Sequence, residues 1–257
     1  MANPPQFDHL RGCAHPVVFE TGIAEAPFSV AGTAFVVGFE SLLYVLTARH
    51  VVRDWSKEQI AIIMSAAGER LALRTRWEIR FHTEDAPSDE NDDDSDLLIY
   101  RADLEGISPE TRRSNHLLHL TPPNASSWFE TRDESLFFLF GYPTHANGPD
   151  YEQSKVVKNQ YLLHGQYVGP SITDGCFEIQ VKNPLNLSTF AGLSGSPVFS
   201  LRTSGEPIQP TFCGMALRGT IILQHLARAS AALMRNVSRH FGAALTLYVR
   251  DVHYTLC

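Results

Sequence analysis

Three polar residues in a fixed order constrain the fold more than any other feature of this sequence. His50 closes the segment Leu-Thr-Ala-Arg-His, Asp96 opens Asp-Leu-Leu-Ile-Tyr, and Ser194 lies within Gly-Leu-Ser-Gly-Ser-Pro, residues 192–197. Histidine, aspartate and serine can form a hydrolytic triad in which the serine is the nucleophile. Because 46 residues separate His50 from Asp96 and 98 separate Asp96 from Ser194, each interval has room for several strands. Such a triad would form across a fold and not within one local motif.

Short apolar segments between turn residues indicate an all-β protein. The expected strands include residues 17–20, 32–37, 42–46, 71–73, 97–100, 136–140, 176–181, 197–199, 212–217 and 245–249. One later segment differs: from His225 to Phe241 the apolar residues recur at helical spacing, which predicts a helix. At 257 residues and 44% hydrophobic content, the chain can bury the core of two small barrels packed as one unit.

Composition and charge exclude several functions. The net charge is −7 without a basic stretch, so we expect no nucleic-acid partner. No apolar run is long enough for a membrane span, and the N-terminus has neither the basic nor the apolar region of a signal peptide. The cysteines are too far apart for a disulfide framework or a zinc site, so we expect free thiols, no metal and a cytoplasmic location. They are Cys13, Cys176, Cys213 and Cys257.

Taken together, these segments resemble the trypsin-like (chymotrypsin-fold) serine peptidases, especially disulfide-free bacterial members such as HtrA-type proteases and glutamyl endopeptidases. The order His, Asp, Ser is that of this superfamily. The matching motifs are Gly-Thr-Ala-Phe-Val at 32–36, Thr-Ala-Arg-His-Val-Val at 47–52, Phe-Gly-Tyr-Pro at 140–143 and Gly-Leu-Ser-Gly-Ser-Pro at 192–197. The resemblance covers about residues 17–241.

The resemblance implies one peptidase domain of two six-stranded antiparallel β-barrels with a C-terminal helix. We expect the first barrel at residues 16–105 and a connector at 106–133. The second barrel would occupy residues 134–224, and the helix and tail 225–257.

The chemistry of the triad assigns a role to each residue. A serine hydroxyl needs a base within hydrogen-bond reach, which would be His50, and Asp96 would hold the correct tautomer of that imidazole. The backbone N–H groups of Gly192 and Ser194 would form the oxyanion hole, in a turn so tight that little besides glycine fits. The expected enzyme is a serine endopeptidase acting on polypeptides without a cofactor.

Departures from the family pattern bear on activation and specificity. Val51 stands where the secreted animal enzymes have a disulfide cysteine, and Leu193 stands where their Asp pairs with a newly cut N-terminal ammonium. Leucine cannot make that ion pair, so we expect no activation by N-terminal insertion. The resemblance places the substrate pocket at residues that include no acid, which disfavours a Lys or Arg preference. They are Ser188, Thr189, Leu217, Arg218 and Gly219.

The acidic segment before Asp96 leaves the triad acid open. Asp93 or Asp94 would be the acid if the strand started earlier, although Asp-Leu-Leu-Ile at 96–99 matches the family better. Asp92, Asp94 and Asp96 also match the first ligands of a calcium loop, but Leu97 takes the place of the required glycine. A solvated loop is the preferred interpretation.

We expect the activity of this protease to be controlled by a regulatory partner or by an activating protease, as in a bacterial defence or stress pathway. Two other functions remain open. The first is a catalytically silent pseudo-protease that binds peptides or scaffolds an assembly. The second is a protease that cleaves itself once. An α/β-hydrolase does not fit, because Ser196 would have to be glycine and the histidine would have to follow the serine. Asp251 and His253 do follow it but lie too close together for that architecture.

Overall fold

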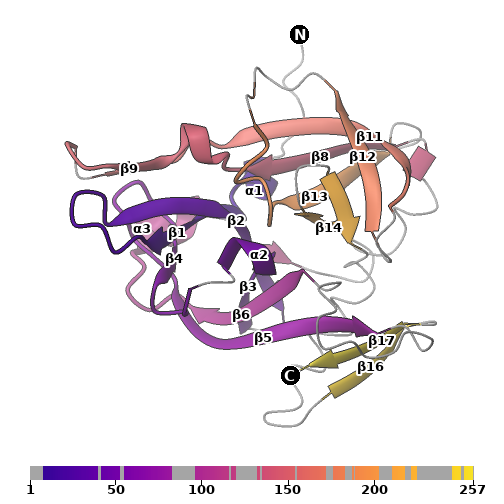
Figure 1. The fold of residues 1–257 in the computed structure, drawn as a ribbon, viewed down its shortest axis with the longest axis horizontal. Coiled ribbons are helices and arrows are strands. Elements are labelled where there is room, and N and C mark those ends of the chain that lie inside the picture. The colour runs from indigo at the N-terminus through magenta and orange to yellow at the C-terminus, as the bar shows by residue number, and fades with distance from the viewer. Residues whose placement is uncertain are drawn as a thin grey trace.

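The computed structural model consists mainly of antiparallel strands (Figure 1). It describes residues 8–39, 42–52, 55–82, 96–115, 117–119, 132–133, 135–153, 155–171, 176–182, 187, 189–202, 210–217, 221–224, 245–249 and 252–256. The strands of the first half are β1 Ala14–Glu20, β2 Phe28–Phe39, β3 Leu42–Ala48, β4 Ile60–Ile62, β5 Ala72–His82, β6 Leu97–Asp103 and β7 Leu118–His119. Those of the second half are β8 Ser135–Gly141, β9 Gly148–Asp150, β10 Lys155–Val157, β11 Tyr161–Pro170, β12 Cys176–Lys182, β13 Pro197–Arg202, β14 Pro210–Leu217 and β15 Ile221–Gln224, followed by β16 Leu245–Val249 and β17 Val252–Leu256. Short helices are α1 Asp8–Arg11, α2 Arg49–Val52, α3 Pro109–Ser114 and the 3-10 turn η2 Thr144–Ala146.

The strands of the first half form a curled sheet, which β16 and β17 from the end of the chain extend. Its strand order is β16-β17-β5-β6-β3-β2-β1-β4, and β7 pairs with β2 in parallel. The chain passes from β4, at one end of this strand order, to β5, near the other end, through a short turn. Ile63 and Arg70 form a bridge there, and the Leu71 N–H donates to the Ile62 carbonyl at 3.1 Å. The antiparallel pairing of β3 with β6 sets Ala48 opposite Leu97, so that the end of β3 lies beside the start of β6.

The second half closes into a barrel with the order β11-β12-β15-β14-β13-β8. The apolar run of β8 fits this position because both of its faces are covered. Phe137 and Leu139 point into the barrel's own cluster, whereas Phe138 and Phe140 belong to a cluster shared with the first half of the chain. Successive side chains of a strand point to opposite faces, so an uninterrupted run is what two covered faces require.

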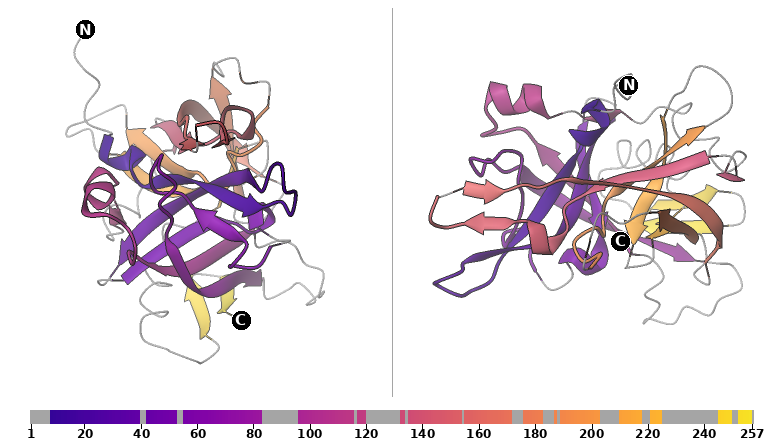
Figure 2. Two further views of the ribbon diagram at one scale, coloured as in Figure 1. Left: turned by 90° about the vertical axis from the view of Figure 1, so that its left-hand side faces the viewer. Right: turned by 90° about the horizontal axis from the view of Figure 1, so that it is seen from above.

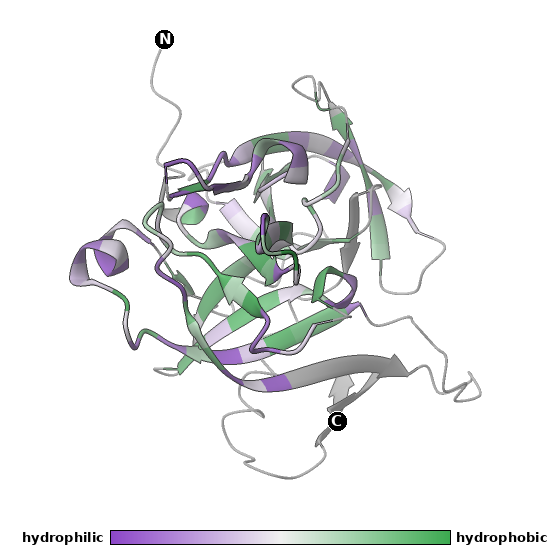
Figure 3. Ribbon diagram, turned by 60° about the vertical axis from the view of Figure 1, so that its left-hand side comes forward, coloured by the Kyte–Doolittle hydropathy of each residue, from purple (hydrophilic) through white to green (hydrophobic). Residues whose placement is uncertain are grey.

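The two halves share a continuous core. The Phe35 ring on β2 lies 5.5 Å, centroid to centroid, from that of Phe212 on β14, and Phe212 also contacts Phe199. Figure 3 shows the hydrophobic residues gathered on the inner strands of both sheets. Because protein interiors are close-packed, this core fixes the relative position of the two barrels.

Two hairpins project together from one end of the molecule, β1–β2 and β9–β10 (Figure 2). The Tyr151 hydroxyl donates to the Phe28 carbonyl and accepts from the Phe28 N–H, both at 2.9 Å. These bonds join the β9–β10 hairpin of the second half to β2 of the first.

The predicted fold class is confirmed: the protein is mostly β, with two curled antiparallel sheets that match a chymotrypsin-like double barrel. The predicted strand at residues 245–249 is β16. It continues into β17, which pairs with β5 of the first sheet. The helix expected at 225–241 lies outside the described residues. No helix among the residues that the structure describes is long and apolar enough to cross a membrane.

Candidate active site

His50 and Asp96 meet where β3 ends and β6 begins. The pairing of Ala48 with Leu97 brings the residues next to these strand ends together. The His50 N–H donates to Asp96 Oδ1 at 2.8 Å, and His50 Nδ1 is hydrogen-bonded to Asp96 Oδ2. The Arg49 N–H donates to the Asp96 carbonyl at 2.9 Å. Asp96 therefore holds both the backbone and the ring of His50.

This contact sets the chemistry of the imidazole. A carboxylate accepts hydrogen bonds, so its partner Nδ1 carries the proton and Nε2 is left as the basic nitrogen. The His50 side chain is 32% exposed and that of Asp96 is 13% exposed. The ring can thus be reached from solvent while the carboxylate that orients it stays largely covered. Asp93 and Asp94 lie outside the described residues.

Ser194 lies in a turn built from backbone hydrogen bonds. The Leu193 N–H donates to the Phe190 carbonyl at 3.1 Å, and the Ser196 N–H donates to the Leu193 carbonyl at 3.0 Å. Gly192 and Gly195 flank the serine with φ values of +91° and +87°, a region that side-chain-bearing residues rarely adopt. The two glycines are therefore required by the shape of the turn.

The turn packs against β2 of the first half and β14 of the second. The Gly195 N–H donates to the Ala216 carbonyl of β14 at 2.8 Å, and the Ser194 carbonyl accepts from the Thr33 N–H of β2 at 3.0 Å. A Cβ atom added to Gly32 would lie 3.1 Å from that Ser194 carbonyl oxygen and 2.8 Å from Val51 Cγ1. Gly32 thus receives both the serine turn and the residue after His50, which brings these two parts of the predicted triad to one place.

Two N–H groups of the turn are free to bind a ligand. Neither the Gly192 N–H nor the Ser194 N–H donates to an acceptor within the described part of the chain. The Ala191 carbonyl accepts from the Thr144 N–H at 2.9 Å. Since the N–H and C=O of a trans peptide point in opposite directions, the Gly192 N–H points away from Thr144. Two such donors are the elements of an oxyanion hole.

Two of the predicted pocket residues fall within the described chain. Thr189 Oγ1 accepts from the Ala191 N–H at 3.1 Å, so it caps its own loop. Leu217 ends β14 and its side chain is buried in the shared core. Ser188, Arg218 and Gly219 lie outside the described residues, and the pocket stays a prediction.

The contacts of one residue of the site, Thr33, carry no signal in the sequence. Thr33 was part of a matching strand motif, but its hydroxyl contacts Tyr142 and Gly192, which lie 109 and 159 residues away. No local pattern predicts such contacts.

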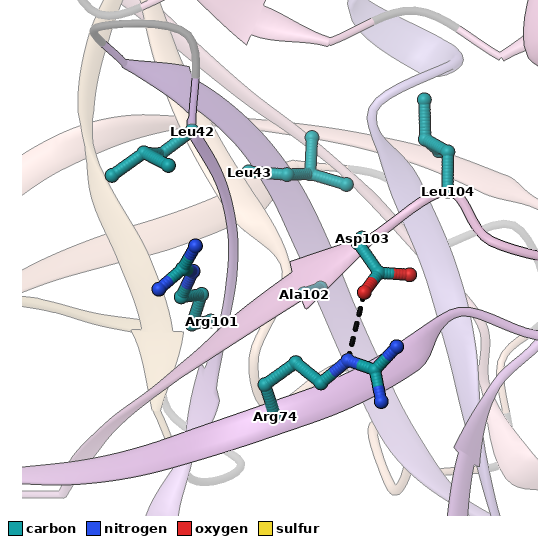
Figure 4. Close-up of a pocket in the computed structure, with 7 residues that line it drawn as sticks. All are labelled: Leu42, Leu43, Arg74, Arg101, Ala102, Asp103 and Leu104. Atoms are coloured by element: carbon teal, nitrogen blue, oxygen red, sulfur yellow. Dashed lines mark hydrogen bonds and ion pairs between the residues drawn. The ribbon is translucent and has the colours of Figure 1, made fainter.

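A separate surface pocket lies on the first sheet (Figure 4). Arg74 Nε donates to Asp103 Oδ2 at 2.7 Å in this pocket, and Leu42 and Leu43 line its other side. Asp103 ends β6, whereas Asp96 precedes its first residue. The pocket is therefore a strand's length from Asp96 and is not part of the site.

No protein-family model and no curated protein sequence matches this chain. Among solved structures, the crystal structure of a scabies mite inactivated protease paralogue, S-I1, is similar with a TM-score of 0.52. The two chains are 15% identical over 91% of this chain and 99% of the other. At this identity the likeness concerns the fold alone, and that fold is the chymotrypsin-like double β-barrel.

Proposed function

We propose that the protein is a serine endopeptidase. The observation that carries the proposal is that Asp96 is hydrogen-bonded to both the ring Nδ1 and the backbone N–H of His50. This pair lies beside the turn of Ser194. The N–H groups of Gly192 and Ser194, which donate to no acceptor among the described residues, support the same function. A base, the group that orients it, a hydroxyl and two donors are the parts that acyl transfer needs.

In the proposed reaction, Ser194 Oγ attacks the carbonyl carbon of a peptide bond while His50 Nε2 takes the hydroxyl proton. The resulting oxyanion accepts hydrogen bonds from the Gly192 and Ser194 N–H groups. The C–N bond then breaks as His50 returns the proton to the leaving amine, which leaves an acyl group on Ser194. Water, deprotonated by the same imidazole, releases the acid and restores the serine.

The proposal extends to the setting of the enzyme. We propose a cytoplasmic bacterial protease acting on polypeptides, whose activity is controlled by a partner protein or by an upstream protease. The absence of an acid among the predicted pocket residues favours substrates that do not present Lys or Arg at the cleaved bond. A purified chain that degrades bulk cellular protein unaided would contradict the proposed control.

The test is covalent labelling with a fluorophosphonate, read by intact mass. We expect one adduct on the wild-type protein and none on Ser194→Ala. Asp96→Asn should label about 10³–10⁴-fold more slowly, because the amide favours the wrong imidazole tautomer. The matched changes Asp93→Asn and Asp94→Asn should leave the rate unchanged.

A folded wild-type protein that takes up no label before or after limited proteolysis, and none when cell extract is added to supply a partner, would contradict the proposal. That result would favour the silent peptide-binding alternative. A discrete shorter fragment that accumulates in the wild type but not in Ser194→Ala would instead indicate a protease that cleaves itself.

A further inference from the structure

Thr33 of β2 is fully buried between the two barrels and uses every hydrogen-bonding group that it has. Its hydroxyl donates to the Gly192 carbonyl at 2.7 Å and accepts from the Tyr142 N–H at 2.9 Å. Its backbone N–H donates to the Ser194 carbonyl at 3.0 Å. Its carbonyl accepts from the Thr47 hydroxyl at 2.8 Å. One residue of the first barrel therefore holds both ends of the segment Gly192–Ser194.

These contacts restrain the turn next to its two N–H donors. The donors belong to the Ala191–Gly192 and Leu193–Ser194 peptides, and Thr33 binds the carbonyl of the peptide that follows each of them. The Thr144 N–H fixes the carbonyl of Ala191, and the Thr33 hydroxyl fixes the carbonyl of Gly192. With both carbonyls held, the peptide planes on either side of Gly192 cannot rotate independently. Such rotation is otherwise open to Gly192, because glycine lacks the Cβ that restricts other residues.

The second barrel holds the same turn by hydrogen bonds at its two ends, at Ala191 and at Gly195, and by packing at Leu193 between them. Leu193 is 3% exposed and lies in the cluster of Phe137 and Leu139. Packing of this kind is not directional, and it sets the depth of the turn without aiming an N–H group. A buried hydroxyl that both donates and accepts does aim its partners, since hydrogen bonds weaken steeply away from linearity.

We propose that Thr33 is a positioning residue, which holds the turn of Gly192–Ser194 so that both N–H groups face the reacting carbonyl. The inference rests on the proposed protease function for its catalytic consequence. The conformational part, that the Thr33 hydroxyl orders the turn, can be measured without any activity.

The first experiment compares Thr33→Val, which keeps the shape and removes the hydroxyl, with Thr33→Ser, which keeps the hydroxyl. We expect Thr33→Val to lower the maximal rate of fluorophosphonate labelling roughly 10- to 100-fold, with about the same half-saturating concentration, because misplaced oxyanion donors act on the transition state. Thr33→Ser should retain the rate within about threefold. Thr111→Val is the matched control, because Thr111 is a buried threonine that instead bonds Glu69.

The second experiment follows amide hydrogen exchange of the peptide spanning residues 189–196, with Ser194→Ala as the common background. The Leu193, Gly195 and Ser196 N–H groups are bonded within the turn or to β14, so they report on its order. Exchange should quicken in Thr33→Val, stay unchanged in Thr33→Ser and Thr111→Val, and stay slow in β8 throughout.

The outcomes separate the two proposals. Unchanged exchange in Thr33→Val, or wild-type labelling by that variant, overturns the positioning role. Equal slowing of labelling by Thr33→Val and Thr111→Val also overturns it, because the loss would then be general. If the wild-type protein takes up no label but exchange still quickens only in Thr33→Val, the protease function fails and the positioning role stands.

Discussion

Gly141 and Ser196 share a space that holds only one side chain. A Cβ atom added to Gly141 would lie 2.2 Å from Ser196 Oγ and 2.7 Å from Leu193 Cδ2. Ser196 is fully buried, and its hydroxyl has no hydrogen-bond partner within the described part of the chain. Both residues follow from the resemblance motifs, but only the structure shows that each depends on the other.

The change Gly141→Ala should destabilise the protein by about 1–3 kcal/mol through overpacking. The variant Ser196→Gly lacks the hydroxyl. In that background Gly141→Ala should lower the free energy of unfolding by less, so the coupling free energy between the two changes should be about 1 kcal/mol. Rescue should be partial because Leu193 still crowds the site. Urea unfolding of the four proteins measures the coupling. Strictly additive costs would contradict the shared space.

At the scale of one strand, β1 carries a histidine where no solvent reaches. His15 is 1% exposed and pairs with Ala34 of β2. Burial lowers the pKa of His15 from 6.5 to about 3, and the nearby Lys158 adds to the effect. The folded protein therefore keeps this ring neutral at pH values where an unfolded chain would protonate it.

Stability should accordingly fall as the pH drops below the unfolded pKa of 6.5, because only the unfolded state binds the proton. Between about pH 7 and about pH 5.5 the loss from this group is about 1 kcal/mol. The decline continues until the folded pKa of about 3 is reached. Denaturant unfolding at the two pH values should show the loss in the wild type and a smaller one in His15→Leu. An equal slope in both proteins would contradict the assignment.

The strands that the sequence predicts are those whose pattern is set by burial. These strands, β3, β6, β8 and β14, are rich in apolar residues. Each is paired with a strand on both edges, and both of its faces are covered. β11 was missed. Buried and exposed residues alternate along β11, but two of the exposed residues are apolar: Leu162 is 48% exposed and Val168 is 59% exposed. Hydrophobic and polar residues therefore do not alternate in the sequence of this strand. The pairing of β17 with β5 was also missed, because such long-range pairing leaves no local signal.

The predicted triad and oxyanion residues came from motifs, since each lies beside a strand whose pattern is recognisable. The network of Thr33 could not be foreseen in the same way. Its partners are backbone groups, which every sequence has, and the approach of β2 to the Gly192 turn depends on how two barrels dock. A sequence motif thus indicates candidate catalytic side chains more readily than the backbone contacts that place them.

At the scale of the whole molecule, the state of the N-terminus should not affect the site. Leu193 packs in an apolar cluster and offers no charge to a terminal ammonium. A short N-terminal extension should therefore leave the rate of fluorophosphonate labelling within about twofold of wild type. Leu193→Asp, which would bury an unpaired carboxylate, should abolish labelling and lower the melting temperature. Loss of labelling on extension alone would indicate that a free N-terminus is needed.

The docking of the barrels also decides when, during synthesis, the proposed chemistry begins. His50 and Asp96 lie beside strands of the first sheet, whereas Ser194 and the two proposed oxyanion amides lie in the second half of the chain, with Thr33 linking the halves. Ribosomes deliver the N-terminal part first, and units of structure fold as they emerge. A growing chain would thus hold a base and its partner acid but no nucleophile. If the proposed function holds, the nascent chain has no protease activity until the second barrel has folded onto the first.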